Sequence, residues 1–293
     1  MERLTGMLLE CLQSFKLTIS IRIIEDPDLC RPVFSNLICS PSAANKSMCL
    51  NGAQAARVAG VFSDFYGNNG TLLFPRLQPG AELSAFYIYL SGQPFPYTVD
   101  WFRYAILSDP TWDPTTFNLA DAILADELNL FNISTFDADL YGFKNAGGKI
   151  LTYQGMQDQV ITSDNSERYY KKLSQTMNLP PSGLDSFYRY FRISGMGHCS
   201  GGPGAWKIGQ AYSKDPKSFE PEDNILLAMV NWVEKGVAPD FVRGTKYVND
   251  TAALGVDFRR KHCKFPARNM YVGPGKSTDE DAWKCILDLG TVM

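Results

Sequence analysis

Hydrophobic and polar positions follow a regular order in the second half of the chain. Residues 137–145 have the pattern of a short helix that ends at Gly147-Gly148, and Lys149 to Tyr153 form an apolar run typical of a buried strand. A second helix is predicted over 166–177, and an aromatic-rich strand over 187–193. This order of helices and strands predicts an α/β domain with a parallel sheet.

A further amphipathic helix is predicted over 222–235. Its apolar stripe consists of Ile225, Leu226, Met229, Val230 and Val233, and Gly236 and Pro239 stop it. The stripe is expected to face the core.

The first part of the chain has a different texture, rich in Pro, Gly, Asn and aromatic residues. One helix start is clear, because Asn51 stands three residues before Gln54, the spacing of a capping box. An apolar stripe follows at Ala55, Val58, Ala59, Phe62 and Phe65. Residues 17–24 alternate and could pair as a strand. We predict an irregular lid over 1–130, with an atypical stretch over 1–22, and a layered α/β domain over 131–293.

Composition narrows the class of protein. The chain has 293 residues, 45% hydrophobic and 20% charged, enough for a sizeable core. The net charge of −3 gives no overall attraction to nucleic acid or to an anionic membrane. No apolar run reaches 18 residues, so no membrane-spanning helix is expected.

Seven cysteines and four N-x-Ser/Thr sequons together indicate an oxidising, secretory compartment. The candidate glycosylation sites are Asn45, Asn69, Asn132 and Asn249. Residues 1–15 do not have the pattern of a signal peptide, because Glu10 interrupts the apolar stretch and no small-residue cleavage site follows. We therefore expect the natural start to lie upstream.

Two loops carry the candidate chemistry, and each follows a predicted strand. Asp158 comes after the strand 149–153, and His198 comes after the strand 187–193. Reactive groups of open α/β sheets lie beyond the carboxyl ends of strands. The order acid before base matches the later part of the Ser, Asp, His order of α/β-hydrolases, in which the acid orients the imidazole.

Each residue has a plainer interpretation. An aspartate after a strand is often a turn former, and a histidine in a glycine-rich loop is often not catalytic. The other histidine, His262, lies in the basic run Arg259 to His262, which we expect to be a solvated surface rather than a nucleic-acid patch.

No serine has the glycine-flanked context of a nucleophile elbow. Ser200 is too close in sequence to His198, and Ser182 lacks the first glycine. Cys199 could serve as a thiol nucleophile, but a disulfide is the favoured interpretation.

With these residues in view, the sequence resembles the tannase and feruloyl esterase family of secreted esterases. The matching stretches are Ile24 to Cys30, Phe74 to Glu82, Gln154 to Asp158, Gly195 to Pro203 and Val233 to Asp240. The most specific of them is the His-Cys-x-Gly-Gly-Pro element at His198. The resemblance extends from Ile24 to nearly the C-terminus.

The resemblance implies the C-terminal part of an α/β-hydrolase fold with a large inserted lid. It assigns Asp158 as the orienting acid and His198 as the general base. It also implies that Cys199 pairs with a cysteine beside the nucleophilic serine, and that both of those residues lie upstream of residue 1. Calcium is usual in lids of the family, but Ser14 to Arg22 contain no acidic ligand, so we expect no metal and no other cofactor.

The remaining cysteines can be paired by proximity in sequence. Cys39 with Cys49, Cys263 with Cys285 across a loop and a short helix near Thr278, and Cys11 with Cys30 are the favoured pairs, which leaves Cys199 without a partner. Other pairings stay open.

The favoured hypothesis is a carboxylic ester hydrolase that acts on small aromatic esters of the feruloyl or galloyl type, with this chain inactive alone. The lid aromatics Phe86, Tyr87, Tyr89, Phe95, Tyr97, Trp101, Phe102 and Tyr104 suit a phenolic pocket or, more simply, lid core. The alternatives are a non-catalytic protein that binds phenolic ligands and a fragment that cannot fold alone.

Overall fold

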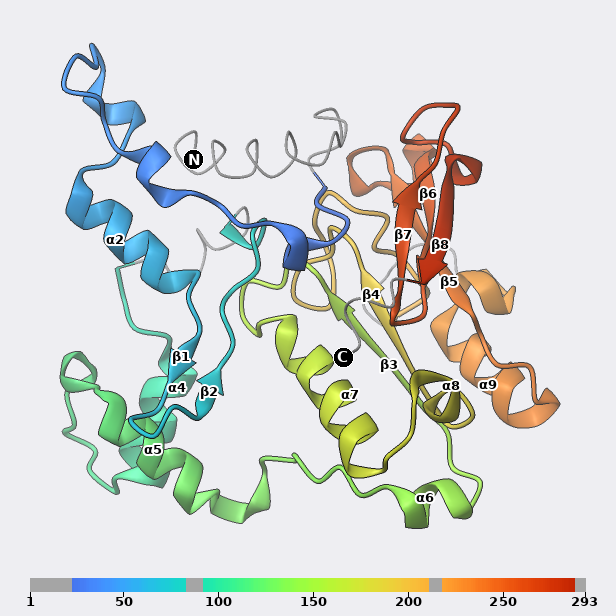
Figure 1. The fold of residues 1–293 in the computed structure, drawn as a ribbon, viewed down its shortest axis with the longest axis horizontal. Helices are drawn as coiled ribbons and strands as arrows, with labels where there is room; N and C mark the ends of the chain where they lie inside the picture. The colour runs from blue at the N-terminus through green and yellow to red at the C-terminus, as the bar shows by residue number, and fades with distance from the viewer. Residues whose placement is uncertain (1–22, 83–91, 211–217, 288–293) are drawn as a thin grey trace.

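The computed structural model describes residues 23–82, 92–210 and 218–287 (Figure 1). Two kinds of structure divide the molecule in that view. The elements from α2 to α5 lie on one side, and a layered region of strands flanked by helices lies on the other. The division into a lid over 1–130 and an α/β domain over 131–293 stays a prediction.

Short elements joined by turns make up the first region. They are α2 (Gly52–Val61), β1 (Phe65–Tyr66), β2 (Leu72–Phe74), α4 (Pro96–Asp100), a π-helical turn (Trp101–Ile106) and α5 (Leu119–Leu128), with 3-10 turns at Pro27–Leu29, Phe34–Leu37, Lys46–Met48, Pro114–Thr116 and Leu130–Asn132. The sheet in this part of the described chain is the antiparallel pair β1–β2. The irregular texture expected from the turn-rich sequence is therefore present.

Helix α2 begins with the predicted capping box. The side chain of Asn51 accepts from the Gln54 amide at 2.9 Å, and the Gln54 side chain accepts from the Asn51 amide at 3.0 Å. Of the predicted stripe, Ala55 and Phe62 are buried, whereas Phe65 belongs to β1 and is exposed. Two reciprocal bonds satisfy backbone donors that an uncapped helix start would leave free.

The layered region is built on two parallel strands, β3 (Ile150–Gly155) and β4 (Tyr188–Ile193). Their register aligns Ile150 with Tyr188 and Gly155 with Ile193, so both strands end at the same edge. Helices α7 (Asp164–Thr176) and α8 (Pro181–Leu184) form the crossover between them, and α6 (Tyr141–Asn145) precedes β3. The predicted parallel sheet is confirmed.

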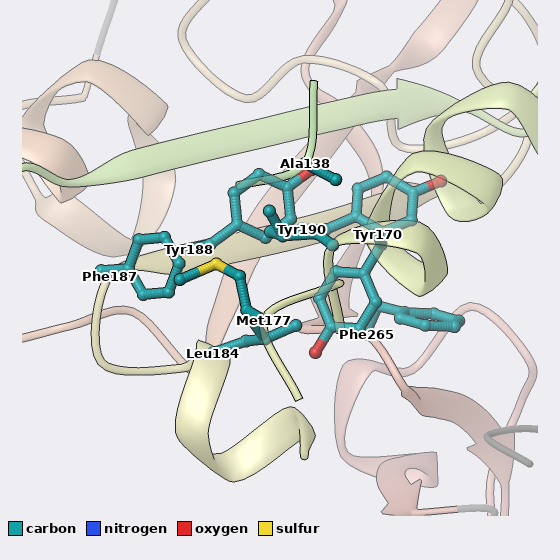
Figure 2. Close-up of a cluster of buried hydrophobic side chains, with 9 residues drawn as sticks. Ala138, Tyr170, Met177, Leu184, Phe187, Tyr188, Tyr190 and Phe265 are labelled. Carbon is teal, nitrogen blue, oxygen red and sulfur yellow. The ribbon is translucent and has the colours of Figure 1, made fainter. Parts of the chain in front are cut away.

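Strand β4 is buried along its whole length because both faces are covered. On one face Tyr188 and Tyr190 pack with Tyr170 of α7 and with Phe265, and this aromatic cluster is shown in Figure 2. On the other face Phe191 and Ile193 belong to a second cluster, whose further members include Trp206, Ile208, Ile225 and Val242. This double burial fixes the strand that leads to the His198 loop.

Helix α9 (Ile225–Lys235) packs on that second face but not with the predicted stripe. Its buried residues are Ile225, Ala228 and Trp232, whereas Leu226 is 67% exposed and Val233 61% exposed. Apolar residues lie on both sides of this helix, so the pattern alone was ambiguous, and the indole of Trp232 has the larger area to bury. The predicted core face was therefore wrong for Leu226, Val230 and Val233.

Two antiparallel hairpins complete the region: β5 (Phe241–Tyr247) pairs with β6 (Val256–Cys263), and β7 (Ala267–Tyr271) pairs with β8 (Trp283–Leu287). The basic run of β6 is not the solvated surface we expected. Arg259 is exposed, but Arg260 is 1% exposed and His262 fully buried. Side chains of a strand alternate between faces, so half of the run points inward.

Buried polar contacts make that arrangement tolerable. The guanidinium of Arg260 pairs with Glu25, donates to the Ser277 carbonyl at 2.8 Å and lies 3.5 Å from the centre of the Trp283 ring. Burial lowers the pKa of His262 to about 4, which leaves a neutral ring that bonds the Ala205 carbonyl at 2.9 Å through Nε2. The Arg260 guanidinium and the His262 imidazole can both be buried because each has a hydrogen-bonding partner.

Two predicted disulfides are present, Cys39–Cys49 and Cys263–Cys285. The second joins the end of β6 to β8. In the loop that it closes, a three-residue 3-10 turn (Glu280–Ala282) stands in place of the predicted short helix. Cys11, most of the predicted strand 17–24, and the stretch Ser14 to Arg22 lie outside the described residues, so the Cys11–Cys30 pair stays a prediction. Within the described ranges, no helix has the length and hydropathy to cross a bilayer.

Candidate active site

The two candidate loops leave the carboxyl ends of β3 and β4 in backbone contact. The Met156 amide donates to the Ile193 carbonyl at 3.0 Å, and the Gln157 amide donates to the Met196 carbonyl at 2.9 Å. Gly155 makes this approach feasible, because a Cβ there would lie 2.3 Å from the Gly197 carbonyl oxygen. A side chain at position 155 would force the loops apart.

Asp158 is the central acceptor of the site and is 1% exposed. Its Oδ1 accepts from the amides of Val160 at 2.8 Å and Ile161 at 2.9 Å. Its Oδ2 lies 2.9 Å from the Gln154 Nε2 and 2.9 Å from the His198 Nδ1. Four partners hold the carboxylate in one orientation, which the buried position requires.

His198 presents the opposite edge of its ring. With Asp158 ionised, the carboxylate can only accept, so Nδ1 carries the proton and Nε2 of the neutral imidazole is an acceptor. The side chain is 45% exposed, and no described residue hydrogen-bonds Nε2. An imidazole oriented by a buried carboxylate, with its second nitrogen open, can take a proton from an incoming hydroxyl group.

The loop after β4 folds back on itself through glycines. The Gly197 amide donates to the Gly201 carbonyl at 3.1 Å, and the Gly204 amide donates to the Gly195 carbonyl at 2.9 Å. Gly202 has a φ of 99° and its Cα faces the Gly195 carbonyl, so a Cβ there would lie 2.2 Å from that oxygen. The loop geometry thus requires the glycines of the His-Cys-x-Gly-Gly-Pro element.

Cys199 is exposed and forms no disulfide with another described cysteine, and its predicted pairing with an upstream cysteine stays a prediction. Burial, with the negative charge of Asp158 as a second cause, raises the pKa of its thiol. A raised pKa leaves less thiolate, and the thiolate is the nucleophilic form. Cys199 is therefore a poor candidate for the attacking group.

The described residues place no serine against His198. Ser200 makes no hydrogen bond to the ring, and Ser182 lies in α8, which precedes β4 and so belongs to the opposite end of that strand. The acid and the base are brought together as predicted, and the nucleophile is absent from the described site.

Sequence reasoning did not identify Gln154 and Gln159 as supports of the site. The Gln159 side chain accepts from the His198 amide at 3.2 Å, so one amide fixes the acid and another fixes the base. The available signal was the density of glutamines around the acid, since three of the six residues from Gln154 to Gln159 are glutamine.

The sequence analysis also did not identify a largely buried ionic network centred on β4. Arg192 of β4 contacts Asp26 at 3.1 Å, Asp28 at 3.0 Å and Glu167 at 3.3 Å. Burial lowers the pKa of Arg192, but these carboxylates outweigh it and the net shift is upward. Burial, Asp164 and Asp26 together raise the pKa of Asp28 to about 6. Asp28 also lines a cavity of about 670 Å³ that is distinct from the Asp158–His198 pair.

The lid aromatics divide into core and surface. Phe102 is buried, Tyr97 is 77% exposed and Tyr104 is 64% exposed, while Phe86, Tyr87 and Tyr89 lie outside the described residues. The described residues contain no group of three or more metal-ligating side chains. The expectation of no metal concerned a stretch that the structure does not describe, and it stays an expectation.

A parallel strand pair that brings a carboxylate to an imidazole at its carboxyl edge defines an α/β-hydrolase-type protein. The chain belongs to the tannase and feruloyl esterase family, whose model matches residues 21–286. Both the predicted fold class and the predicted family are thereby confirmed.

Several relatives support the assignment. The chain is 56% identical over 263 residues to a probable feruloyl esterase B-1 of Neosartorya fischeri, covering 90% of this chain and 49% of that protein. A probable feruloyl esterase B-2 of Aspergillus fumigatus is 52% identical, with 90% and 50% covered. The chain thus spans about half the length of the curated relatives it matches.

Solved structures agree. The crystal structure of feruloyl esterase B from Aspergillus oryzae superposes with a TM-score of 0.90 at 48% identity, covering 97% of this chain and 56% of that one. A tannin acyl hydrolase from Aspergillus niger gives a TM-score of 0.73 at 18% identity, which shows the common fold alone.

Proposed function

We propose that this chain supplies the acid and the base of a secreted carboxylic ester hydrolase that acts on small aromatic esters of the feruloyl or galloyl type. The single observation that carries the proposal is the 2.9 Å contact between His198 Nδ1 and Asp158 Oδ2, with Nε2 open. The substrate class rests on the names of the relatives, which are feruloyl esterases.

The reaction is acyl transfer through a serine. The serine hydroxyl gives its proton to His198 Nε2 while its oxygen bonds to the ester carbonyl carbon, and His198 then gives that proton to the departing alcohol. A water then attacks the acyl-enzyme: His198 Nε2 takes its proton and passes it to the serine oxygen, and the carboxylic acid is released. Asp158 remains ionised and stabilises the imidazolium. No metal or other cofactor takes part in these steps.

No described serine hydrogen-bonds the His198 ring, and no serine in the sequence has the glycine-flanked context of a nucleophile elbow. Purified alone, the chain should therefore hydrolyse neither methyl ferulate nor methyl gallate above the rate with His198→Ala. Turnover that His198→Ala abolishes would contradict this, because it would require a nucleophile within the chain.

The positive test starts from the transcript. We propose that its 5′ end encodes an in-frame segment with a Cys-Ser pair in a glycine-flanked turn, and that the extended chain is active. In that protein Asp158→Asn should lower kcat by about 10⁴-fold and His198→Ala by about 10⁶-fold, the losses seen when the acid or the base of a triad is removed. Full activity of either variant would refute the assigned roles. Asp139→Asn, at an exposed position before α6, is the matched control.

A second candidate function has one specific observation in its favour. An open pocket of about 340 Å³ in the lid is lined by the aromatic side chains Phe65, Phe74, Trp101, Phe102 and Phe117. A non-catalytic protein that binds phenolic ligands would be stabilised against heat by ferulic acid without hydrolysing its ester. A cooperative melt would also exclude a chain that cannot fold alone.

We further propose that the protein is secreted and carries N-linked glycans. Asn45, Asn69, Asn132 and Asn249 are all exposed, and both observed disulfides suit an oxidising compartment. Digestion with a glycosidase that removes N-linked glycans should lower the apparent mass of the natural protein. No change in mass would count against glycosylation.

A further inference from the structure

Glu82 is a buried carboxylate that the proposed reaction does not use. It is 8% exposed and ends the segment Gln78–Glu82, in which Gln78 and Ala81 are fully buried. Its Oε2 accepts from the Gly80 amide at 2.7 Å, while its Oε1 is buried without a partner among the described residues. Among the described residues, one of the two carboxyl oxygens of Glu82 therefore has a hydrogen-bond partner and the other has none.

The same glycine touches the acid loop. Gly80 has a φ of 104°, and a Cβ on it would lie 2.7 Å from the Nε2 of Gln157. Gln157 is 3% exposed, and its Nε2 is a second buried polar atom without a partner in the described residues. Gly80 therefore contacts two residues that each have an unpaired polar atom among the described residues: the acceptor Oε1 of Glu82 and the donor Nε2 of Gln157.

Gln157 is directly connected to both members of the acid–base pair. It precedes Asp158 in the chain, and its amide donates to the Met196 carbonyl in the loop that leads to His198. A change in the position of Gln157 would be transmitted to the acid through one peptide bond and to the base loop through one hydrogen bond.

The ionisation of Glu82 depends on burial and on two backbone amides. Burial raises the pKa of Glu82 to about 7, and the hydrogen bonds from its own amide and that of Gly80 oppose the shift. Across the described residues, no lysine, arginine, histidine or second carboxylate contributes to it. The carboxyl group is thus neutral in mildly acidic solution and ionised in mildly alkaline solution.

We propose that Glu82 is a positioning residue for the Asp158–His198 pair, and that it holds the acid loop through Gly80 and Gln157 in a way that depends on its own protonation. Neutral Glu82 avoids a buried charge, whereas ionised Glu82 leaves a charged oxygen, Oε1, without a donor among the described residues. The Nε2 of Gln157, which lies against Gly80, is a buried donor without an acceptor among those residues, and we assign it as the group that responds. The proposal rests on the proposed function, since it concerns the same pair.

The test compares Glu82→Gln with the natural chain between pH 5 and pH 8.5. The glutamine mimics the neutral acid, and Glu127→Gln on the exposed end of α5 makes the same chemical change as a control. Two readouts are taken: the melting temperature, and the NMR signals of the Gln157 side-chain amide and of the Val160 and Ile161 amides, which bond Asp158.

The sign of the stability effect follows from the direction of the shift. An acid whose pKa is higher in the folded state adds stability below its unfolded value of 4.5, and that stability is lost as the pH rises through about 7. The natural chain should therefore lose melting temperature relative to Glu82→Gln between pH 5 and pH 8. The three amide signals should show an inflection near pH 7 that Glu82→Gln removes and Glu127→Gln retains.

Each outcome decides a separate point. A constant difference in melting temperature across the range would show that Glu82 does not titrate there, and the proposal would fail. An inflection in stability without any in the amide signals would leave Glu82 as a structural group only and would also refute it. Should Glu82→Gln not fold, the Gln157 side-chain signal of the natural chain still decides, because a flat curve sinks the proposal. The esterase test of the extended chain fails or succeeds independently of these signals.

Discussion

Substitution of Arg192 tests how far buried ion pairs stabilise β4, the strand that leads to the His198 loop. Its guanidinium is 7% exposed and contacts three carboxylates, those of Asp26, Asp28 and Glu167. It also stacks 5.2 Å from the centre of the Phe265 ring. Arg192→Met keeps the length and most of the packing but removes the charge and its donors, so one buried carboxylate, Asp26, and two partly buried ones lose their common partner.

The magnitude follows from burial. Removing one member of a buried ion pair costs about 3–5 kcal/mol, because the remaining charge stays in a poor dielectric. Asp26 keeps a contact to Arg268 at 2.7 Å and Glu167 one to Lys171 at 2.8 Å, so the lower half of that range is expected. At about 2–4 °C per kcal/mol for a large domain, the melting temperature should fall by roughly 10 °C.

The matched control is Arg243→Met. Arg243 also bonds several carboxylates, Asp223 among them at 2.5 Å, but its side chain is 22% exposed and that of Glu222 57%, so water can replace part of the lost bonds. The cost should therefore lie closer to the value of surface pairs, about 0–1 kcal/mol, than to that of a buried pair. Urea and thermal unfolding at pH 7, followed by circular dichroism, should therefore separate the two variants clearly.

The pH dependence provides an internal check. Arg192 lowers the pKa of Asp28, which burial, Asp164 and Asp26 nonetheless raise to about 6. In Arg192→Met the pKa of Asp28 should rise further, so the variant recovers stability relative to the natural chain as the pH falls from 7 to 5. Equal losses for both variants at pH 7, or a gap that does not narrow at pH 5, would refute the reasoning.

Three further substitutions probe single contacts. Gly155→Ala should destabilise the chain by about 3 kcal/mol or more, since its Cβ would lie 2.3 Å from the Gly197 carbonyl oxygen, and a normal urea midpoint would contradict this. Cys285→Ala opens the loop closed by Cys263 and should cost about 3 kcal/mol, which the same titration under oxidising conditions measures. Tyr190→Phe should be neutral or stabilising by up to about 1 kcal/mol, because it removes a buried hydroxyl without a partner; a large drop in melting temperature would reveal a bond that the structure does not contain.

Elements with strong local signals were predictable from the sequence. The capping box at Asn51, the apolar run of β3 and the glycine turns after β3 and β4 each depend on neighbours within a few residues. Because β3 and β4 are parallel, placing one polar group after each strand was enough to predict that Asp158 and His198 meet.

Properties set by distant partners were not predictable. Arg260 is buried because Glu25, more than two hundred positions earlier, neutralises it, and nothing near Arg260 in the sequence announces that partner. The prediction of the buried face of α9 was wrong for a related reason: that face is determined by the sheet against which the helix packs, and not by the helix sequence alone. The relation between Glu82 and Gln157 likewise exists only in the folded chain, where Gly80 bonds the first and lies against the second.

The parallel pairing of β3 and β4 has a kinetic consequence. Asp158 and His198 are 40 positions apart, and their contact exists only after the whole α7–α8 crossover has packed against the sheet. Contacts of long sequence separation form slowly, because loop closure must precede them. During synthesis or refolding, the imidazole should therefore acquire its carboxylate partner only after α7 and α8 have already formed.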